Sequence, residues 1–340
     1  MFRARPVAAA AALASLALAA TACGTGGGQQ EDGGPWKPDR PIEIIAPAAT
    51  GGGWDTLART SGRVLEEGGL VDEPVQVVNK PGGGGSIGWA YVAQTPDTPT
   101  RLFVTSPPIS LVPLMGGSTY DHEDFTPIAR LATENMVYLV PEDSPIESWG
   151  DMVDRLKEDP RQVSIAGGSS PGSMDHVALA GAVEAAGIDP TAINYVPFDG
   201  GGEAMTQAVG GHVDAVVTGG SEAAGLVESG DLRPLAVSGA ERASTLPDTP
   251  TLREEGVDFT YDIWRGVMGP PDMTDEQVAY YEDLFTDMTE EESWKKQTEA
   301  LGWTDSFMRS EEFGDFLDQS STDSAAILMK IGLIEDEEGR

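Results

Sequence analysis

Positively charged residues are scarce in this sequence. Lys and Arg number 21 against 56 Asp and Glu, which gives a formal net charge of -35. Nucleic acid is excluded as a partner, because binding to a phosphate backbone requires a basic surface. At 340 residues the chain can still bury a sizeable core, and its length predicts two lobes.

Cysteine and histidine are scarce as well. Cys23 is the only cysteine, and His122, His176 and His212 follow no spacing typical of metal ligands. A His/Cys metal site is therefore not expected, and the chain has no cysteine pair for a disulfide. The many carboxylates include no Asp-x-Asp-x-Asp-Gly calcium loop. We expect neither a metal nor a cofactor.

A long apolar run, residues 7–20, follows two arginines near the N-terminus. This order is typical of a secretory signal peptide, and the run is short for a membrane span. It ends just before Cys23, in a segment that resembles the lipobox of bacterial lipoproteins, with Ala20 where Leu is commoner. We predict a signal peptide over residues 1–22, a lipid on Cys23, and a flexible Gly-rich tether over residues 23–35. The mature protein is then extracytoplasmic and lipid-anchored to the outer face of the cell membrane.

From Pro41 onward, strand patterns alternate with helix patterns, which favours an α/β fold with parallel strands. Strands are predicted around residues 42–45, 75–79 and 102–106, and each runs into a loop of small residues. The carboxyl ends of such strands share one edge of the sheet, where ligands of open α/β sheets bind. The first of these loops, residues 48–55, carries three glycines at the start of a helix. Free N–H groups at a helix N-terminus can hold an anion without Lys or Arg.

A second α/β unit follows in the middle of the chain. Its first strand is predicted at residues 163–166, and the loop 168–173 opens its first helix. Extended segments at 125–131 and 136–140 lead away from the first unit, and residues 263–268 return to it. Two lobes joined by extended crossings form a hinged clamp that suits a small ligand.

Local signals mark several helix ends. Ser170 or Ser173 is expected to cap the helix that follows residue 173, and Thr274 to Gln277 form a capping box. Two apolar stripes near the C-terminus, one with Phe313 and one with Ile327, are expected to pack into the core.

One enzyme motif occurs. Gly84-Gly85-Ser86-Ile87-Gly88 fits the Gly-x-Ser-x-Gly nucleophile elbow of hydrolases, but the elbow needs its serine directly after a strand, and four glycines precede Ser86. A cell-surface serine hydrolase using Ser86 stays a second hypothesis. Gly51 to Gly53 lack the Lys-Ser/Thr of a P-loop, so nucleotide binding is not indicated.

Taken together, residues 41–333 resemble the substrate-binding proteins of tripartite tricarboxylate transporters, the Bug-type periplasmic binding proteins. The matching stretches are Gly52-Gly53-Trp54-Asp55, 78–88, 124–129, 210–214, 232–237 and 246–251. The resemblance implies a two-lobed periplasmic-binding-protein fold of the Venus-flytrap, type II-like kind, with a ligand cleft between the lobes and no catalytic residue. It also implies a monomer that delivers a small di- or tricarboxylate, citrate-like by preference, to membrane permease subunits. A receptor for an ABC importer or for a sensor kinase is the alternative binding function.

The resemblance implies how the chain divides into a leader, a tether, two lobes and a tail. The expected parts are a signal peptide (1–22), a tether (23–35), the first part of lobe 1 (36–135), lobe 2 (136–262), the return crossing with the C-terminal helices of lobe 1 (263–334), and an acidic tail (335–340).

The resemblance also implies which residues line the cleft. The two glycine- and serine-rich loops are expected to grip the ligand carboxylate, and strand-end residues of both lobes to complete the site. The ligand-binding candidates are Ala49, Thr50, Gly51, Gly52, Gly53, Trp54, Asp55, Thr105, Ser106, Ser169, Ser170, Pro171, Gly172, Ser173, Phe198, Asp199, Asp214, Thr218 and Arg265. Phe198 and Asp199 stand where the family commonly has Tyr and Lys, so an acid replaces a base. Arg265 either compensates for that lost cation or forms a structural salt bridge.

Overall fold

The computed structural model describes residues 35–335. The predicted signal peptide, Cys23, most of the tether and most of the acidic tail lie outside the described residues. From Trp36 onward the chain forms one compact unit. No helix among the described residues is both long enough and apolar enough to cross a membrane.

The first half of the sheet is built around three parallel strands, as the alternation of strands and helices predicts. β1 (Ile42–Ala46) lies between β2 (Val75–Asn79) and β3 (Arg101–Thr105). β9 (Asp262–Gly269) runs antiparallel to β3 and to the first part of β4 (Thr126–Pro141), and β10 (Thr304–Arg309) pairs with β4 as well. We call this half, with its helices, the first lobe.

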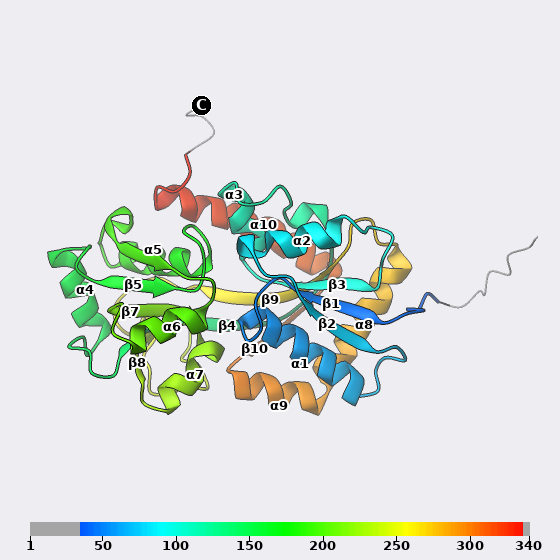
Figure 1. The fold of residues 1–340 in the computed structure, drawn as a ribbon, viewed down its shortest axis with the longest axis horizontal. Helices are drawn as coiled ribbons and strands as arrows, with labels where there is room; N and C mark the ends of the chain where they lie inside the picture. The colour runs from blue at the N-terminus through cyan, green and yellow to red at the C-terminus, as the bar shows by residue number, and fades with distance from the viewer. Residues whose placement is uncertain (1–34, 336–340) are drawn as a thin grey trace, which may run out of the picture. The chain divides into compact units, whose positions relative to one another are not determined.

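The second half continues from the far end of β4. There β4 pairs antiparallel with β7 (Ala215–Gly219) and β8 (Leu232–Val237), while β7, β5 (Ser164–Gly167) and β6 (Asn194–Pro197) are mutually parallel in that order. We call this half the second lobe. Figure 1 shows β4 and β9 running across the middle of the molecule and linking the two halves.

Helices cover both halves (Figure 1). They are α1 (Gly53–Glu67), α2 (Ser86–Ala93), α3 (Pro108–Leu114), α4 (Trp149–Glu158), α5 (Met174–Ala185), α6 (Gly201–Val209), α7 (Gly220–Glu228), α8 (Asp275–Glu290), α9 (Glu292–Leu301) and α10 (Ser310–Lys330), with short 3₁₀ turns η1 (Gly83–Gly85), η2 (His122–Asp124) and η3 (Pro190–Ala192).

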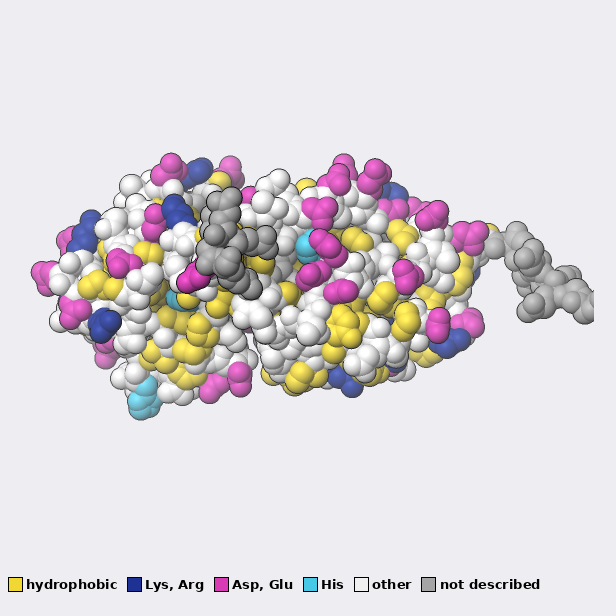
Figure 2. Space-filling model, turned by 90° about the horizontal axis from the view of Figure 1, so that it is seen from above, with side chains coloured by type: hydrophobic (Ala, Val, Ile, Leu, Met, Phe, Trp, Pro, Cys, Tyr) yellow, Lys and Arg dark blue, Asp and Glu magenta, His cyan; other side chains and the backbone are white. Residues whose placement is uncertain are grey.

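Each lobe has its own apolar core. In the first lobe, Ile44 of β1 packs with Leu57 of α1 and Phe285 of α8, and all three side chains are fully buried. In the second lobe, Trp149 of α4 and Ile165 of β5 belong to a separate buried cluster. The surface is acidic, and in Figure 2 Asp and Glu side chains are spread over the visible face with few Lys or Arg between them.

Most predicted elements are confirmed, with three corrections. The segments 125–131 and 136–140 are parts of one strand, β4, rather than two. Helices α3, α4, α7 and α9 and strand β10 were not predicted. The two C-terminal apolar stripes lie largely on one helix, α10, rather than one beyond the other's helix, and their prediction as core is confirmed, since Phe313 and Leu328 are buried.

Replacing Thr274 by Ala is expected to lower the free energy of unfolding by about 1 kcal/mol. The Thr274 hydroxyl accepts the Gln277 N–H, and the Gln277 side chain accepts the Thr274 N–H, so the substitution opens the predicted capping box of α8. Urea unfolding followed by circular dichroism measures the change. Thr274→Ser keeps the hydroxyl and is the control; an equal loss in both variants would show that the box does not stabilise the fold.

Candidate functional site

The Asp55 carboxylate fixes the conformation of the loop between β1 and α1. Asp55, in the first turn of α1, accepts hydrogen bonds from the Gly51 N–H at 2.8 Å and from the Asn79 side-chain amide at 2.8 Å. Arg59, one turn further on, adds an ion pair at 2.9 Å. Gly51 has φ +91°, a conformation that favours glycine. Asp55 therefore shapes the loop and is fully engaged in doing so.

The pKa of Asp55 is lowered in consequence. Burial by itself would raise it, but the hydrogen bonds from Arg59, Gly51 and Asn79 together outweigh that effect. Asp55 is thus a firmly ionised brace of the loop.

The end of β3 closes this side of the site. Ser106 accepts a hydrogen bond from the Trp54 indole N–H at 2.9 Å, and this bond fixes the Trp54 ring, on α1, against the end of β3. Thr105 is fully buried, and its hydroxyl has no hydrogen-bond partner among the described residues.

The loop between β5 and α5 forms the corresponding part of the second lobe. The Gly172 N–H donates to His176 Nδ1 at 3.0 Å, and Gly172 has φ +80°. The Ser169 hydroxyl accepts the Asp175 N–H at 3.1 Å, and the Ser169 carbonyl accepts the Tyr195 hydroxyl at 2.6 Å. Ser169, rather than the predicted Ser170 or Ser173, therefore satisfies the first turn of α5; Ser173 occupies the cap position without a side-chain bond.

Asp175 is a second acid of this loop. Its side chain is 2% exposed, and its Oδ1 has no hydrogen-bond partner among the described residues. Burial, with a smaller contribution from the charge of Glu222, raises its pKa to about 7.

The N-termini of α1, α6 and α7 converge on one carboxylate, that of Glu222. Glu222 Oε1 accepts the Gly53 N–H at 2.9 Å, and Oε2 accepts the Thr218 hydroxyl at 2.7 Å. A Cβ on Gly201 would lie 2.1 Å from Glu222 Oε2, so the start of α6 also lies against it. Because Gly53 belongs to the first lobe and Glu222 to the second, this carboxylate links the two (α1 and α7 in Figure 1).

A buried cation lies beneath the same point. The Arg265 side chain is 4% exposed and forms an ion pair with Glu134, whose other oxygen accepts the Trp303 indole N–H. A Cβ on Gly53 would lie 2.7 Å from Arg265 Nη2, so the guanidinium lies directly against the start of α1. Arg265 thus forms the structural salt bridge that the sequence left open as one alternative.

One predicted residue, Asp214, is not brought to this point. Asp214 precedes β7 and accepts the N–H and hydroxyl of Ser164, at the amino ends of the strands, whereas the loops above follow their carboxyl ends. Phe198 and Asp199 instead follow the carboxyl end of β6, just before α6; Phe198 is partly buried against the second-lobe core, and Asp199 is exposed. The exposed loop candidates are Ala49, Thr50, Gly51, Ser170 and Pro171.

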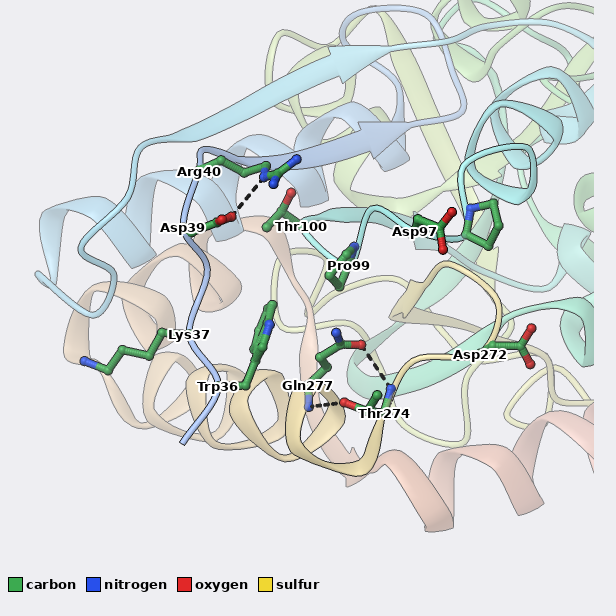
Figure 3. Close-up of a pocket in the computed structure, with 11 residues that line it drawn as sticks. Trp36, Lys37, Asp39, Arg40, Asp97, Pro99, Thr100, Asp272, Thr274 and Gln277 are labelled. Atoms are coloured by element: carbon green, nitrogen blue, oxygen red, sulfur yellow. Dashed lines mark hydrogen bonds and ion pairs between the residues drawn. The ribbon is translucent and has the colours of Figure 1, made fainter. Parts of the chain in front are cut away.

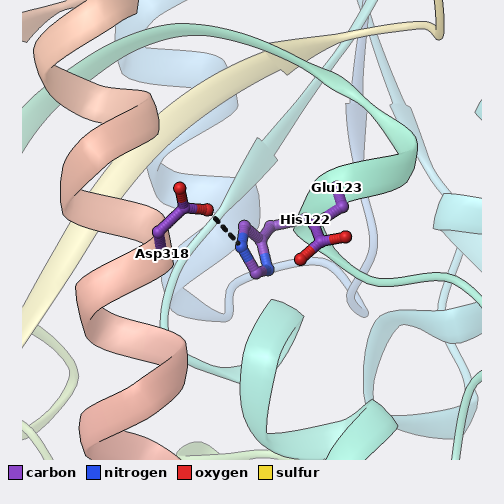
Figure 4. A group of neighbouring side chains, drawn as sticks. All are labelled: His122, Glu123 and Asp318. Carbon is purple, nitrogen blue, oxygen red and sulfur yellow. Dashed lines mark hydrogen bonds and ion pairs between the residues drawn. The ribbon is translucent and has the colours of Figure 1, made fainter.

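Two other features lie apart from the site. A hollow of about 610 Å³ is lined by Trp36, Arg40 and Thr100 among others (Figure 3), at the amino ends of β1 and β3 and thus at the opposite edge of the sheet. His122 lies 3.1 Å from Asp318 and beside Glu123 (Figure 4), and this group ties η2 to α10. The pairing with Asp318 uses His122 Nε2, while His122 Nδ1 is buried and has no hydrogen-bond partner among the described residues.

Comparison with known proteins identifies the family. The model of the tripartite tricarboxylate transporter family receptor matches residues 63–333. The chain belongs to this receptor family. Protein BugT of Bordetella pertussis is 29% identical over 238 residues, which cover 68% of this chain and 71% of BugT.

Solved structures share the fold. A TctC solute-binding protein from Polaromonas is 28% identical, with a TM-score of 0.66 over 86% of this chain and 99% of that one. MatC of Rhodopseudomonas palustris, with bound malate, is 21% identical with a TM-score of 0.75 over 86% and 100% of the two chains. An R. palustris protein with adipate is 23% identical with a TM-score of 0.80 over 87% and 98%. The predicted two-lobed periplasmic-binding-protein fold is confirmed.

Membership of the transporter receptor family also decides between the function classes. These receptors are extracytoplasmic solute-binding proteins without enzymatic activity, so the hydrolase hypothesis for Ser86 is wrong. The structure gives the physical reason. Ser86 opens α2 after the turn η1 and does not follow β2 directly.

Glu222, Glu134 and Asp175 were not predicted from the sequence. A signal for Glu222 was present, since Thr218-Gly219-Gly220-Ser221-Glu222 repeats the pattern of small residues after a strand that marked the other two loops. Glu134 carried no local signal, because its role depends on the pairing of β4 with β9.

Asp55→Asn is expected to lower the free energy of unfolding by about 2 kcal/mol at neutral pH, because several hydrogen bonds to a buried charged acceptor are weakened. A lowered folded-state pKa contributes stability above the ordinary Asp pKa of about 3.9, and that stability is lost as the pH falls through the folded-state pKa. The difference from wild type should therefore shrink toward about pH 3 in urea unfolding.

Asp39→Asn is the matched control for this charge removal, because Asp39 pairs with Arg40 on the exposed surface. It should leave stability unchanged. A loss for Asp55→Asn no greater than that of the control would contradict the assignment of Asp55 as the brace of the loop.

Proposed function

We propose that this receptor captures a small di- or tricarboxylate, citrate-like by preference, and delivers it to the membrane permease subunits of a tripartite tricarboxylate transporter. The observation that carries the proposal is the contact between the Gly53 N–H and a carboxylate oxygen at 2.9 Å. The start of α1 is thus built to receive a carboxylate, here supplied by Glu222. The ligand would lie between the 48–55 and 168–173 loops, with Thr105, Ser106 and Thr218 at the strand ends.

The charge balance of the chain is compatible with an anionic ligand. At physiological salt the repulsion from a net charge of -35 is screened beyond about 8–10 Å. Hydrogen bonds to a charged acceptor in a desolvated cleft can each contribute about 1.5–3 kcal/mol, and micromolar binding requires about 8 kcal/mol. A few N–H contacts, with Arg265 behind them, are then enough for micromolar affinity.

Two structural neighbours support the ligand class. One has bound malate and the other adipate, and both ligands are dicarboxylates. Asp199, which stands where the family commonly has a base, leaves Arg265 as the cation that favours a carboxylate here.

The lipid anchor and the monomeric state also belong to the proposal. A lipid on Cys23 would keep the receptor at the outer face of the membrane, next to its permease. Cys23→Ser should abolish incorporation of a labelled fatty acid into the protein, and labelling that continues in the variant would contradict the lipid on Cys23. A dimer in light scattering of the soluble domain would contradict the monomer.

Isothermal titration of residues 36–340 against citrate, malate, adipate and glutamate tests the ligand class. Micromolar binding of at least one of these carboxylates is expected. Gly52→Val should weaken it at least tenfold, because a side chain would stand among the N–H groups at the start of α1, and Ser170→Ala should weaken it less. Gly225→Val makes the same exchange as Gly52→Val at an exposed position of α7 and should bind like wild type. Binding that is unchanged in both loop variants would refute the two-loop grip, and no binding by any protein would refute the ligand class.

A further inference from the structure

Glu222 lies where a ligand carboxylate is expected. Its Oε1 accepts the Gly53 N–H, which belongs to the first turn of α1 and has no partner within the helix. Its Oε2 accepts a hydrogen bond from the Thr218 hydroxyl at 2.7 Å. Thr218 is another of the residues expected to contact the ligand. Both contacts of the Glu222 carboxylate are therefore ones that a bound carboxylate would use.

The groups around this point include polar atoms that lack partners. Arg265 Nε and Thr105 Oγ1 are buried and have no hydrogen-bond partner among the described residues, and both residues are at most 3% exposed. The same holds for Asp175 Oδ1 in the facing loop. Buried polar groups are normally paired, and each exception calls for an explanation. A small polar ligand between the two loops would supply one.

The cation near Glu222, Arg265, is already paired with another acid, Glu134. Glu134 on β4 forms the ion pair with Arg265 on β9, and the charge of Glu222 raises the pKa of Asp175 on α5, so these two acids repel each other. The other elements against Glu222 are α1, α6 and β7, which present Gly53, Gly201 and the Thr218 hydroxyl. A ligand carboxylate brought here would therefore be a further negative charge beside three acids and one guanidinium.

We infer that Glu222 is a displaceable internal carboxylate: a carboxylate ligand takes over its contacts at Gly53 and Thr218, and Glu222 takes up one proton from solvent as the ligand binds. This inference rests on the proposed carboxylate ligand. The neutral carboxyl group can then donate its O–H to the ligand, so that repulsion between two anions is replaced by a hydrogen bond. Glu222 thus sets the specificity of the cleft, because a ligand without a carboxylate cannot replace it at the start of α1.

The direction of the Glu222 pKa agrees with this mechanism. Burial raises it above the ordinary value of a glutamate, and the charge of Glu134 acts in the same direction, so protonation on ligand binding starts from a carboxyl group already disposed to accept a proton.

The test compares wild type with Glu222→Gln, which keeps the size of the side chain and an acceptor for the Gly53 N–H. Isothermal titration with citrate, malate and adipate is run from about pH 5 to about pH 8, in buffers of different ionisation enthalpy so that proton uptake is counted. For wild type we expect uptake of close to one proton and an affinity that falls by up to about tenfold per pH unit. For Glu222→Gln, once the ionisation of the free ligand is subtracted in both proteins, we expect uptake near zero, a flat pH profile, and binding at least tenfold tighter than wild type near the upper pH.

Two controls assign the proton to this residue. Glu228→Gln, at the exposed end of the same helix, should behave as wild type. Asp175→Asn removes the acid of the facing loop, whose pKa is also raised, and should keep the proton uptake; its loss there, with retention in Glu222→Gln, would overturn the inference. Circular dichroism and thermal unfolding check that each variant is folded.

The remaining outcomes are distinguishable. Wild-type binding without pH dependence, or weaker binding by Glu222→Gln, would overturn the displacement while leaving the carboxylate function in place. Binding by Glu222→Gln when wild type does not bind would support it. Failure of every variant to bind any of the three acids would refute the proposed function, and the inference with it.

Discussion

The buried guanidinium of Arg265 joins the crossing strands to the start of α1. It forms an ion pair with Glu134 across the two crossing strands, lies against Gly53 at the start of α1, and stands 5.1 Å from the centre of the Trp303 ring. Breaking a buried pair of this kind costs about 3–5 kcal/mol, because the remaining partner is left as an uncompensated buried charge. The position of the crossing strands, the start of α1 and the chain around Trp303 therefore depend on one side chain.

The glycines near the cleft are of two kinds. At Gly53, Gly201 and Gly219 an added Cβ would lie within 2.7 Å of Arg265, Glu222 and Glu134 respectively, so these glycines make room for the protein's own charged side chains. At Gly51 nothing lies within 4 Å, and at Gly52 the nearest atom is 3.6 Å away. Only this second kind leaves space in which a ligand can approach the backbone. The sequence pattern of glycines after a strand does not separate the two.

Much of the fold could be predicted from the sequence because its signals are local. β-branched strands, glycine loops and the capping box at Thr274 depend on neighbouring residues, and the predicted strands β1 to β3 and helix α8 are present. The short strand β10 could not be found in this way, since Thr304 to Arg309 are largely polar and owe their conformation to pairing with β4. The site was predictable where it follows a strand directly, as for the 48–55 loop. It was not predictable where it depends on contact between the lobes, as for Glu222 with Gly53, which are 169 residues apart.

The scarcity of cations is consistent with the way the cleft is built. The chain has 21 basic residues against 56 acidic ones. If free Lys or Arg side chains lined the site, surface carboxylates would compete with the ligand for them. Backbone N–H groups at helix starts avoid this competition, because their orientation is fixed by the helix and their partial charge cannot be titrated. The Arg265 guanidinium likewise has a fixed orientation, since it is buried and already paired with Glu134. Such a site has no mobile cation to balance the charge of an incoming anion. A carboxyl group that takes up a proton as the anion binds has the same effect on the net charge, because it removes one negative charge instead of adding a positive one.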